Sequence, residues 1–112
     1  MDNPYHNAYH GFNVTQFIYY MMSKSSKLHT LMNDEEKFCL SLSAVAHDVG
    51  HPGVNNAFLI NIKDELAMRY NDISVLENHH AATLFKVIEL EDCQILSFFS
   101  APEKRALRKL MI

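Results

Sequence analysis

The spacing of apolar side chains in the first half of the chain predicts helices. One apolar stripe recurs every three or four residues and consists of Val14, Phe17, Ile18, Met21 and Met22. Residues 23–27 are polar and interrupt the stripe, and Asn33, followed by three acidic residues, has the form of a helix start. The helix that begins there is almost continuously apolar up to Ala46, which predicts a buried helix. Pro52 and Gly53 are expected to end it.

The second half of the chain shows the same helical spacing behind short capping motifs. Residues 55–62 and 64–70 are each long enough for one short helix. Residues 74–77 (SVLE) and 100–103 (SAPE) have the spacing of capping boxes, which predicts a longer helix after each. The last helix is still in apolar phase at its final residue, so we expect the natural domain to continue and to be truncated here on its C-terminal side. Alternating strand patterns are missing, and the sequence predicts one all-α domain over residues 1–112.

Composition and charge exclude several classes of partner. Apolar residues make up 48% of the chain and charged residues 21%, which is ordinary for a globular protein. The net charge of −3 argues against a surface for nucleic acid or for anionic membranes. We expect no membrane segment and no secretory signal, reduced thiols at Cys39 and Cys93, and therefore a cytoplasmic location. The oligomeric state stays open.

Histidine is frequent, with seven residues in a chain of 112. Six of them fall in close pairs: His6 with His10, His47 with His51, and His79 with His80. Residues four apart on a helix share a face, so each of the two spaced pairs could reach one metal ion. Asp48 follows His47 directly, which places a carboxylate beside an imidazole at the end of the predicted buried helix.

Imidazole and carboxylate together suit a hydrolytic metal site. Histidine favours zinc, whereas carboxylate and water favour magnesium or manganese, and two ions together can activate a water and clamp a phosphoryl group. Other interpretations compete with this one. A spaced pair can arise by chance, His79 and His80 face different ways so that at most one reaches a site, His29 is expected to be solvated, and Glu77 is explained by its capping box. Spacing alone therefore predicts a helical metal-dependent hydrolase and no more.

Three blocks of sequence resemble the class I 3′,5′-cyclic nucleotide phosphodiesterases. Residues 5–10 (YHNAYH) resemble the H-N-x-x-H segment of that family. Residues 47–58 match the signature H-D-x-x-H-P-G-x-x-N-x-F, and residues 65–80 look like the third block, which ends in ENHH. Gly50 stands at a position that is often acidic in the family. The three blocks have the family's order and spacing and cover nearly the whole chain.

The resemblance implies a compact, helical HD-type catalytic domain that holds a zinc ion and a magnesium or manganese ion. By position, His10, His47 and Asp48 match metal ligands, with Asp48 touching both ions. His6 matches the general acid, and His51 and Glu77 match groups that hold metal-bound waters. The cyclic nucleotide substrate is expected to contact three residues, Tyr5, His6 and Asp48.

The implied reaction is hydrolysis of cyclic AMP or cyclic GMP to the nucleoside 5′-monophosphate. The family's fourth metal ligand and its purine-reading residues lie downstream of the last residue here, so the preferred base stays open and this chain alone is expected to be inactive. Two alternatives stand beside this one. The chain could belong to another HD-type metal phosphohydrolase, or it could be a truncated product that only binds a metal or a partner.

Overall fold

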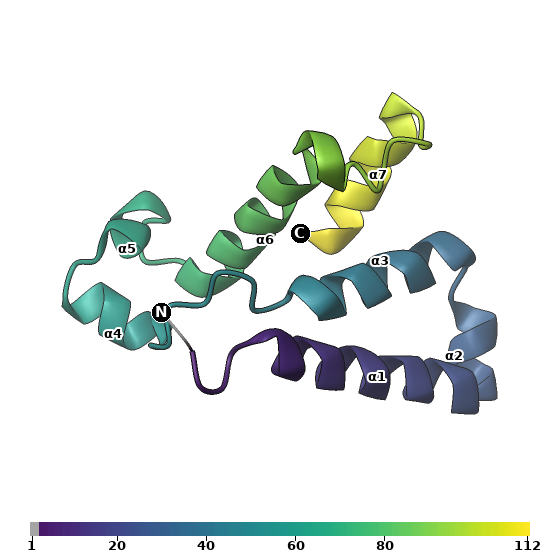
Figure 1. Cartoon of the computed structure of the whole chain (residues 1–112), viewed down its shortest axis with the longest axis horizontal. Coiled ribbons are helices and arrows are strands. Elements are labelled where there is room, and N and C mark those ends of the chain that lie inside the picture. Colours follow the sequence, from purple (N-terminus) through teal and green to yellow (C-terminus); the bar gives the residue numbers. More distant parts are fainter. Residues whose placement is uncertain (1–2) are drawn as a thin grey trace.

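The computed structural model describes residues 3–112, which form seven α-helices and one short 3-10 helix (Figure 1). In chain order they are α1 (Ala8–Lys24), α2 (Ser26–Leu31), α3 (Asp34–Ala46), α4 (Asn56–Asn61), α5 (Glu65–Arg69), α6 (Val75–Ile88), η1 (Glu91–Cys93) and α7 (Ala101–Met111). None of residues 3–112 lies in a β-strand, which confirms the prediction of an all-α chain.

The helices are arranged around α3 and α6. Figure 1 shows α1 and α3 side by side, with α2 joining them at one end. On its other side α3 contacts α7 and α6, while α4 and α5 form a small pair that packs on the start of α6. The chain thus brings the start of α1, the end of α3 and the first turns of α6 into one region.

Two separate clusters of buried apolar side chains hold this arrangement together. The larger joins α3, α6 and α7 through Cys39, Ile88, Leu96 and Leu107. The smaller joins α4, α5 and α6 through Leu59, Ala67, Val75 and Leu76. Because α6 contributes to both clusters, it is anchored at both of its ends.

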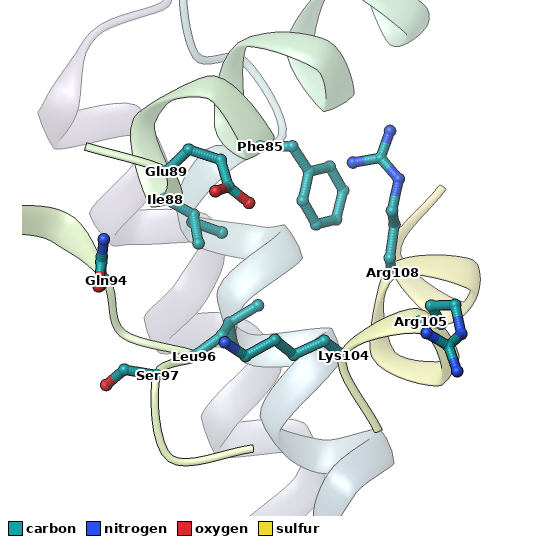
Figure 2. A pocket seen from close by; sticks show the side chains of 9 residues that line it. All are labelled: Phe85, Ile88, Glu89, Gln94, Leu96, Ser97, Lys104, Arg105 and Arg108. Atoms are coloured by element: carbon teal, nitrogen blue, oxygen red, sulfur yellow. The ribbon is translucent and has the colours of Figure 1, made fainter. Parts of the chain in front are cut away.

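The C-terminal end of α6 packs against α7. Figure 2 shows Phe85 beside Arg108, whose guanidinium carbon lies 4.1 Å from the ring centroid. Beneath them, Ile88 and Leu96 form the buried floor of a cavity of about 230 Å³ between the two helices. A cation over an aromatic face is attractive, so this pair adds to the apolar packing that fixes α6 against α7.

The prediction of a buried α3 is only partly correct, and the apolar stripe of α1 is likewise only partly covered. In α3 the buried residues are Cys39, Ala44 and Ala46, while Val45 is 58% exposed. In α1 Met22 is buried, but Phe17 is 63% exposed. Both helices are covered where neighbouring helices contact them: Phe38 and Leu42 of α3 pack against the larger core cluster, whereas apolar side chains such as Val45 and Phe17 face outward.

The end of α3 also differs from the prediction. The helix stops at Ala46, well before Pro52, and residues 47–50 form a turn. In this turn the Val49 amide donates to the Ala46 carbonyl at 3.0 Å, and the His51 amide donates to the Asp48 carbonyl at 3.1 Å. Gly50 has a φ of +73°, which a residue without a Cβ adopts at no steric cost.

The capping box predicted at Ser74 is wrong, whereas those at Asn33 and Ser100 are confirmed. Ser74 has a φ of +43° and makes no side-chain cap bond. Asn56 from α4 takes over this role: its Oδ1 accepts from the Leu76 amide at 2.9 Å, and its Nδ2 donates to Glu77 at 3.0 Å. A residue twenty positions upstream in the chain therefore caps α6, and Glu77 turns toward Asn56 instead of back to Ser74.

Two further expectations concern the thiols and the membrane. Cys39 and Cys93 are both free thiols, as predicted, and Cys39 is buried. Within residues 3–112, no helix combines the length and the apolar character needed to cross a bilayer.

Candidate metal centre

The first two predicted site residues lie at the start of α1. Asn7 is the N-cap of this helix, and its Oδ1 accepts from the amides of Tyr9 at 3.0 Å and His10 at 3.3 Å. His6 therefore stands just before the helix and His10 in its first turn. The two rings lie 5.8 Å apart, edge to face, on the side that faces α3.

A glycine lets this end of α1 approach α3 closely. Gly11 is buried, and a Cβ at this position would lie 3.0 Å from the carbonyl oxygen of Val45. Gly11 follows His10, and Val45 lies two residues before His47. The close backbone contact therefore sets the distance between histidines that belong to different helices.

Three predicted ligands meet at this contact. His10 Nε2 lies 3.2 Å from His47 Nε2 and 3.2 Å from Asp48 Oδ2, and His47 Nε2 lies 2.9 Å from the same carboxylate oxygen. Ligand bonds of about 2.0–2.2 Å to zinc place neighbouring ligand atoms roughly 3.3–3.6 Å apart in tetrahedral geometry. The observed separations are slightly shorter, so the three atoms would move apart by a few tenths of an ångström to occupy three corners of such a site.

The tautomer of His47 also fits a metal ligand. Its Nδ1 lies 2.8 Å from the Ala44 carbonyl, which can only accept, so Nδ1 carries the hydrogen. Nε2 of the neutral ring then presents its lone pair to His10 and Asp48. A lone pair beside a carboxylate oxygen at 2.9 Å is unfavourable unless a positive charge lies near both, which a bound cation or a proton on Nε2 would provide. Backbone carbonyls commonly orient ligating histidines in this way.

His6 and His51 form a second group on the other side of Asp48. His6 Nε2 lies 4.0 Å from Asp48 Oδ2, and its ring stacks on that of His51 at 3.7 Å with an angle of 4°. His6, Asp48 and His51 also offer ligand atoms within 4.8 Å of one another. His51 Nδ1 accepts from the Gly53 amide at 2.9 Å, so its Nε2 carries the hydrogen when the ring is neutral. Burial, and then the neighbouring His6, lower the pKa of His51 and favour that neutral form.

The structure adds two histidines that the sequence did not assign. His80 on α6 is buried; its Nδ1 donates to the Val49 carbonyl at 2.9 Å, and its Nε2 lies 3.8 Å from Asp48 Oδ1. Burial lowers the pKa of His80, against the opposing effects of the Val49 carbonyl and of Asp48. His79 Nε2 donates to the Gly50 carbonyl at 3.1 Å. As predicted, one histidine of this pair reaches Asp48, but the other contacts the same turn.

The structure brings Tyr5 into the site but not Glu77. The Tyr5 ring lies 4.9 Å from that of His6 and 4.8 Å from that of His10, and it is 64% exposed. Glu77 belongs to neither group of candidate ligands and is exposed; the hydrogen bond from Asn56 is the main cause that lowers its pKa. His29 is exposed, as expected.

Asn3 is a further residue that the sequence pattern did not reveal. Its Oδ1 accepts from the His6 amide at 2.9 Å, and its Nδ2 donates to the His51 carbonyl at 3.2 Å. One side chain therefore connects the segment before α1 with the turn after α3. A cavity of about 460 Å³ opens beside Asp48 and His6, with Gly11, Phe12 and Val45 also in its lining.

Known proteins are similar in sequence to this chain over almost its whole length. Residues 5–112 match the model of the family described as 3′5′-cyclic nucleotide phosphodiesterase. The chain is 40% identical to "3′,5′-cyclic-nucleotide phosphodiesterase regA" of Dictyostelium discoideum, over 99% of the chain and 14% of that protein. It is 40% identical to the "Dual 3′,5′-cyclic-AMP and -GMP phosphodiesterase beta" of Plasmodium falciparum, over 97% of the chain and 10% of that protein. It is 42% identical to "3′,5′-cyclic-AMP phosphodiesterase 4C" of Rattus norvegicus, over 96% of the chain and 20% of that protein.

These relatives are much longer, and the chain spans between 10% and 20% of their length. The matched range spans the positions of His10, His47 and Asp48, which converge in the structure. The chain belongs to the 3′,5′-cyclic nucleotide phosphodiesterase family.

Proposed function

We propose that this chain supplies part of the catalytic site of an enzyme that hydrolyses 3′,5′-cyclic nucleotides to nucleoside 5′-monophosphates. The observation that carries the proposal is the meeting of His10, His47 and Asp48, whose ligand atoms lie within 3.2 Å of one another. Family membership supports the substrate class, because the matched relatives are named for cyclic nucleotides in general, for cyclic AMP and cyclic GMP together, or for cyclic AMP.

His10, His47 and Asp48 would hold a zinc ion, since two imidazoles and a carboxylate form a donor set that zinc accepts. Asp48 Oδ1 points away from this group, toward His80, and would serve a second, harder ion such as magnesium or manganese. Bound divalent ions polarise a phosphoryl group and lower the pKa of a coordinated water. The chain's own residues would fix where those ions bind relative to His6.

His6 is suited to supply a proton to the leaving oxygen. Hydrolysis forms a bond from water oxygen to phosphorus and breaks the bond from phosphorus to O3′, which then needs a proton. His6 stands beside the open cavity, with its Nε2 4.0 Å from Asp48 and its ring held by stacking on His51. A histidine is an effective general acid near neutral pH. Tyr5, beside both His6 and His10, would contact the substrate.

The test compares this chain with a longer natural protein that contains it. Each is assayed for hydrolysis of cyclic AMP and cyclic GMP with zinc and magnesium, and each is titrated with zinc. We expect turnover in the longer protein and loss of turnover in its His6→Ala and Asp48→Ala variants. Of these two variants, only Asp48→Ala should also lose zinc binding. His29→Ala, at an exposed histidine outside the site, is the matched control.

Two results would contradict the proposal. A folded, zinc-loaded longer protein that hydrolyses neither nucleotide would point to another HD-type phosphohydrolase or to a binding role. Unchanged turnover in Asp48→Ala would remove the metal centre from the reaction.

We further propose a cytoplasmic location. The free thiols Cys39 and Cys93 support it, because disulfides rather than thiols are the usual state in oxidising compartments. Fluorescence microscopy of the tagged protein tests it, and an extracytoplasmic signal would contradict it.

A further inference from the structure

Asp48 lies on the turn of residues 47–50 and His51 follows it directly, so the position of both depends on what holds that turn in place. Within it, two backbone hydrogen bonds are present, from Val49 to the Ala46 carbonyl and from His51 to the Asp48 carbonyl. We infer that His79 is a positioning residue that clamps this turn to α6 through the Gly50 carbonyl and so sets the place of Asp48. This inference rests on the proposed function, in which Asp48 is a metal ligand.

Two consecutive residues of α6 hold two consecutive carbonyls of the turn. His79 Nε2 donates to the Gly50 carbonyl at 3.1 Å, and His80 Nδ1 donates to the Val49 carbonyl at 2.9 Å. A carbonyl can only accept, so the neighbouring rings donate through opposite nitrogens. In the neutral His80 ring, Nε2 therefore carries no hydrogen and faces Asp48. The N–H of His79 is donated to the backbone carbonyl of Gly50.

Gly50 is shaped for this contact. A Cβ at Gly50 would lie 3.0 Å from His79 Nε2, and the φ of +73° is one that other residues rarely adopt. The histidine therefore approaches the turn as closely as a glycine backbone permits. A larger side chain at position 50 would press on the end of the His79 side chain and displace it from the Gly50 carbonyl.

His79 acts through the turn and not as a ligand. It belongs to neither group of candidate ligands, and the hydrogen on its Nε2 is used by the Gly50 carbonyl. Its helix is a firm support, because Val75, Leu76 and Ile88 are buried in the two core clusters. The clamp thus connects the turn that carries Asp48 to a helix that is held in both core clusters.

The test compares two variants of His79 that differ in whether the new side chain can donate a hydrogen bond. His79→Leu removes the donor but keeps a side chain of comparable volume, whereas His79→Gln keeps an N–H donor at a reach similar to that of the imidazole Nε2. Amide hydrogen exchange is measured at Val49 and His51, whose hydrogen bonds define the turn, and zinc affinity is measured by calorimetry. His29→Leu is the control, at an exposed histidine on α2.

In His79→Leu we expect exchange at Val49 and His51 to rise about fivefold, the effect of one lost hydrogen bond, with exchange in α1 and α7 unchanged. Zinc affinity should fall about tenfold, as for other groups that orient ligands. His79→Gln should keep both values within about twofold of the unmodified chain, since its donor is retained. A merely structural role for His79 would instead raise exchange throughout the chain, and glutamine would rescue nothing.

Exchange at Val49 and His51 that stays unchanged in His79→Leu would overturn the inference. Zinc affinity equal in His79→Leu and the unmodified chain would overturn it as well. If the unmodified chain binds no zinc, the proposed metal centre fails, but the exchange measurement still decides whether the clamp exists.

Discussion

Replacing Gly11 with alanine should weaken metal binding without unfolding the chain. Gly11 lies at the contact between α1 and α3, and a Cβ there would stand 3.0 Å from the Val45 carbonyl oxygen. That distance is tighter than nine in ten real Cβ contacts, so the two helices must separate by a few tenths of an ångström. The neighbour is backbone, which cannot move aside as a flexible side chain could.

The size of this shift determines whether metal binding or folding stability is affected more. His10 is on α1 and His47 with Asp48 follows α3, so the helices carry the ligands apart by the same few tenths of an ångström. Metal–ligand distances in proteins hold to within about 0.2 Å, so the shift exceeds the tolerance of the site. For folding stability, the cost of separating the helices is offset by helix propensity. Alanine is favoured over glycine inside a helix by about 0.5–1 kcal/mol.

We therefore expect zinc affinity to fall about tenfold in Gly11→Ala, the loss typical of a misplaced ligand, while the urea midpoint changes little. Calorimetry with zinc and urea melts followed by circular dichroism check the two expectations. Gln16→Ala, at an exposed position of the same helix, is the control. Zinc affinity equal to that of the unmodified chain would refute the reasoning, since the contact with Val45 would then not set the ligand spacing.

Three other expectations follow from individual contacts. Asn56→Ala should lower the free energy of unfolding by about 1 kcal/mol, the usual value of a helix cap, whereas Ser74→Ala should cost less than about 0.5 kcal/mol; urea melts that order them the other way would contradict the cap assignment. Because the Asn56 hydrogen bond lowers the pKa of Glu77, its stabilisation is present above the ordinary pKa of glutamate and is lost as pH falls through the folded-state pKa. A carboxyl NMR titration should therefore show a higher pKa for Glu77 in Asn56→Ala, and an unchanged pKa would count against the bond. Iodoacetamide should alkylate Cys93 before Cys39, because burial raises the pKa of the Cys39 thiol; equal rates in peptide mass spectrometry would contradict this.

Helix positions could be predicted from the sequence wherever the deciding forces are local. The caps at Asn33 and Ser100 use residues three positions apart, and both form as expected. Ser74 has the same local pattern, but Asn56 reaches the start of α6 from another helix and satisfies the Leu76 amide instead. A competing donor or acceptor twenty positions away leaves no trace in a local pattern.

The ligands of the candidate site could be named from the sequence, but their support could not. His10, His47 and Asp48 converge as the family resemblance implied. The side chains that hold them act over long separations: Asn3 reaches His51, and His79 reaches Gly50. Such contacts depend on how α6 and the first residues fold back on the end of α3, which spacing along the chain does not encode.

The spaced histidines also meet for a different reason from the one the spacing suggested. Neither pair lies on one helix, because His6 precedes the N-cap of α1 and His51 follows the turn after α3. The site is instead built where one helix starts and another ends. The end of α3 carries a partial negative charge, which disfavours the Asp48 carboxylate but favours a cation by about 0.3–1 kcal/mol. A carboxylate held beside that helix end, with an imidazole lone pair facing it, is an arrangement that a bound divalent cation stabilises.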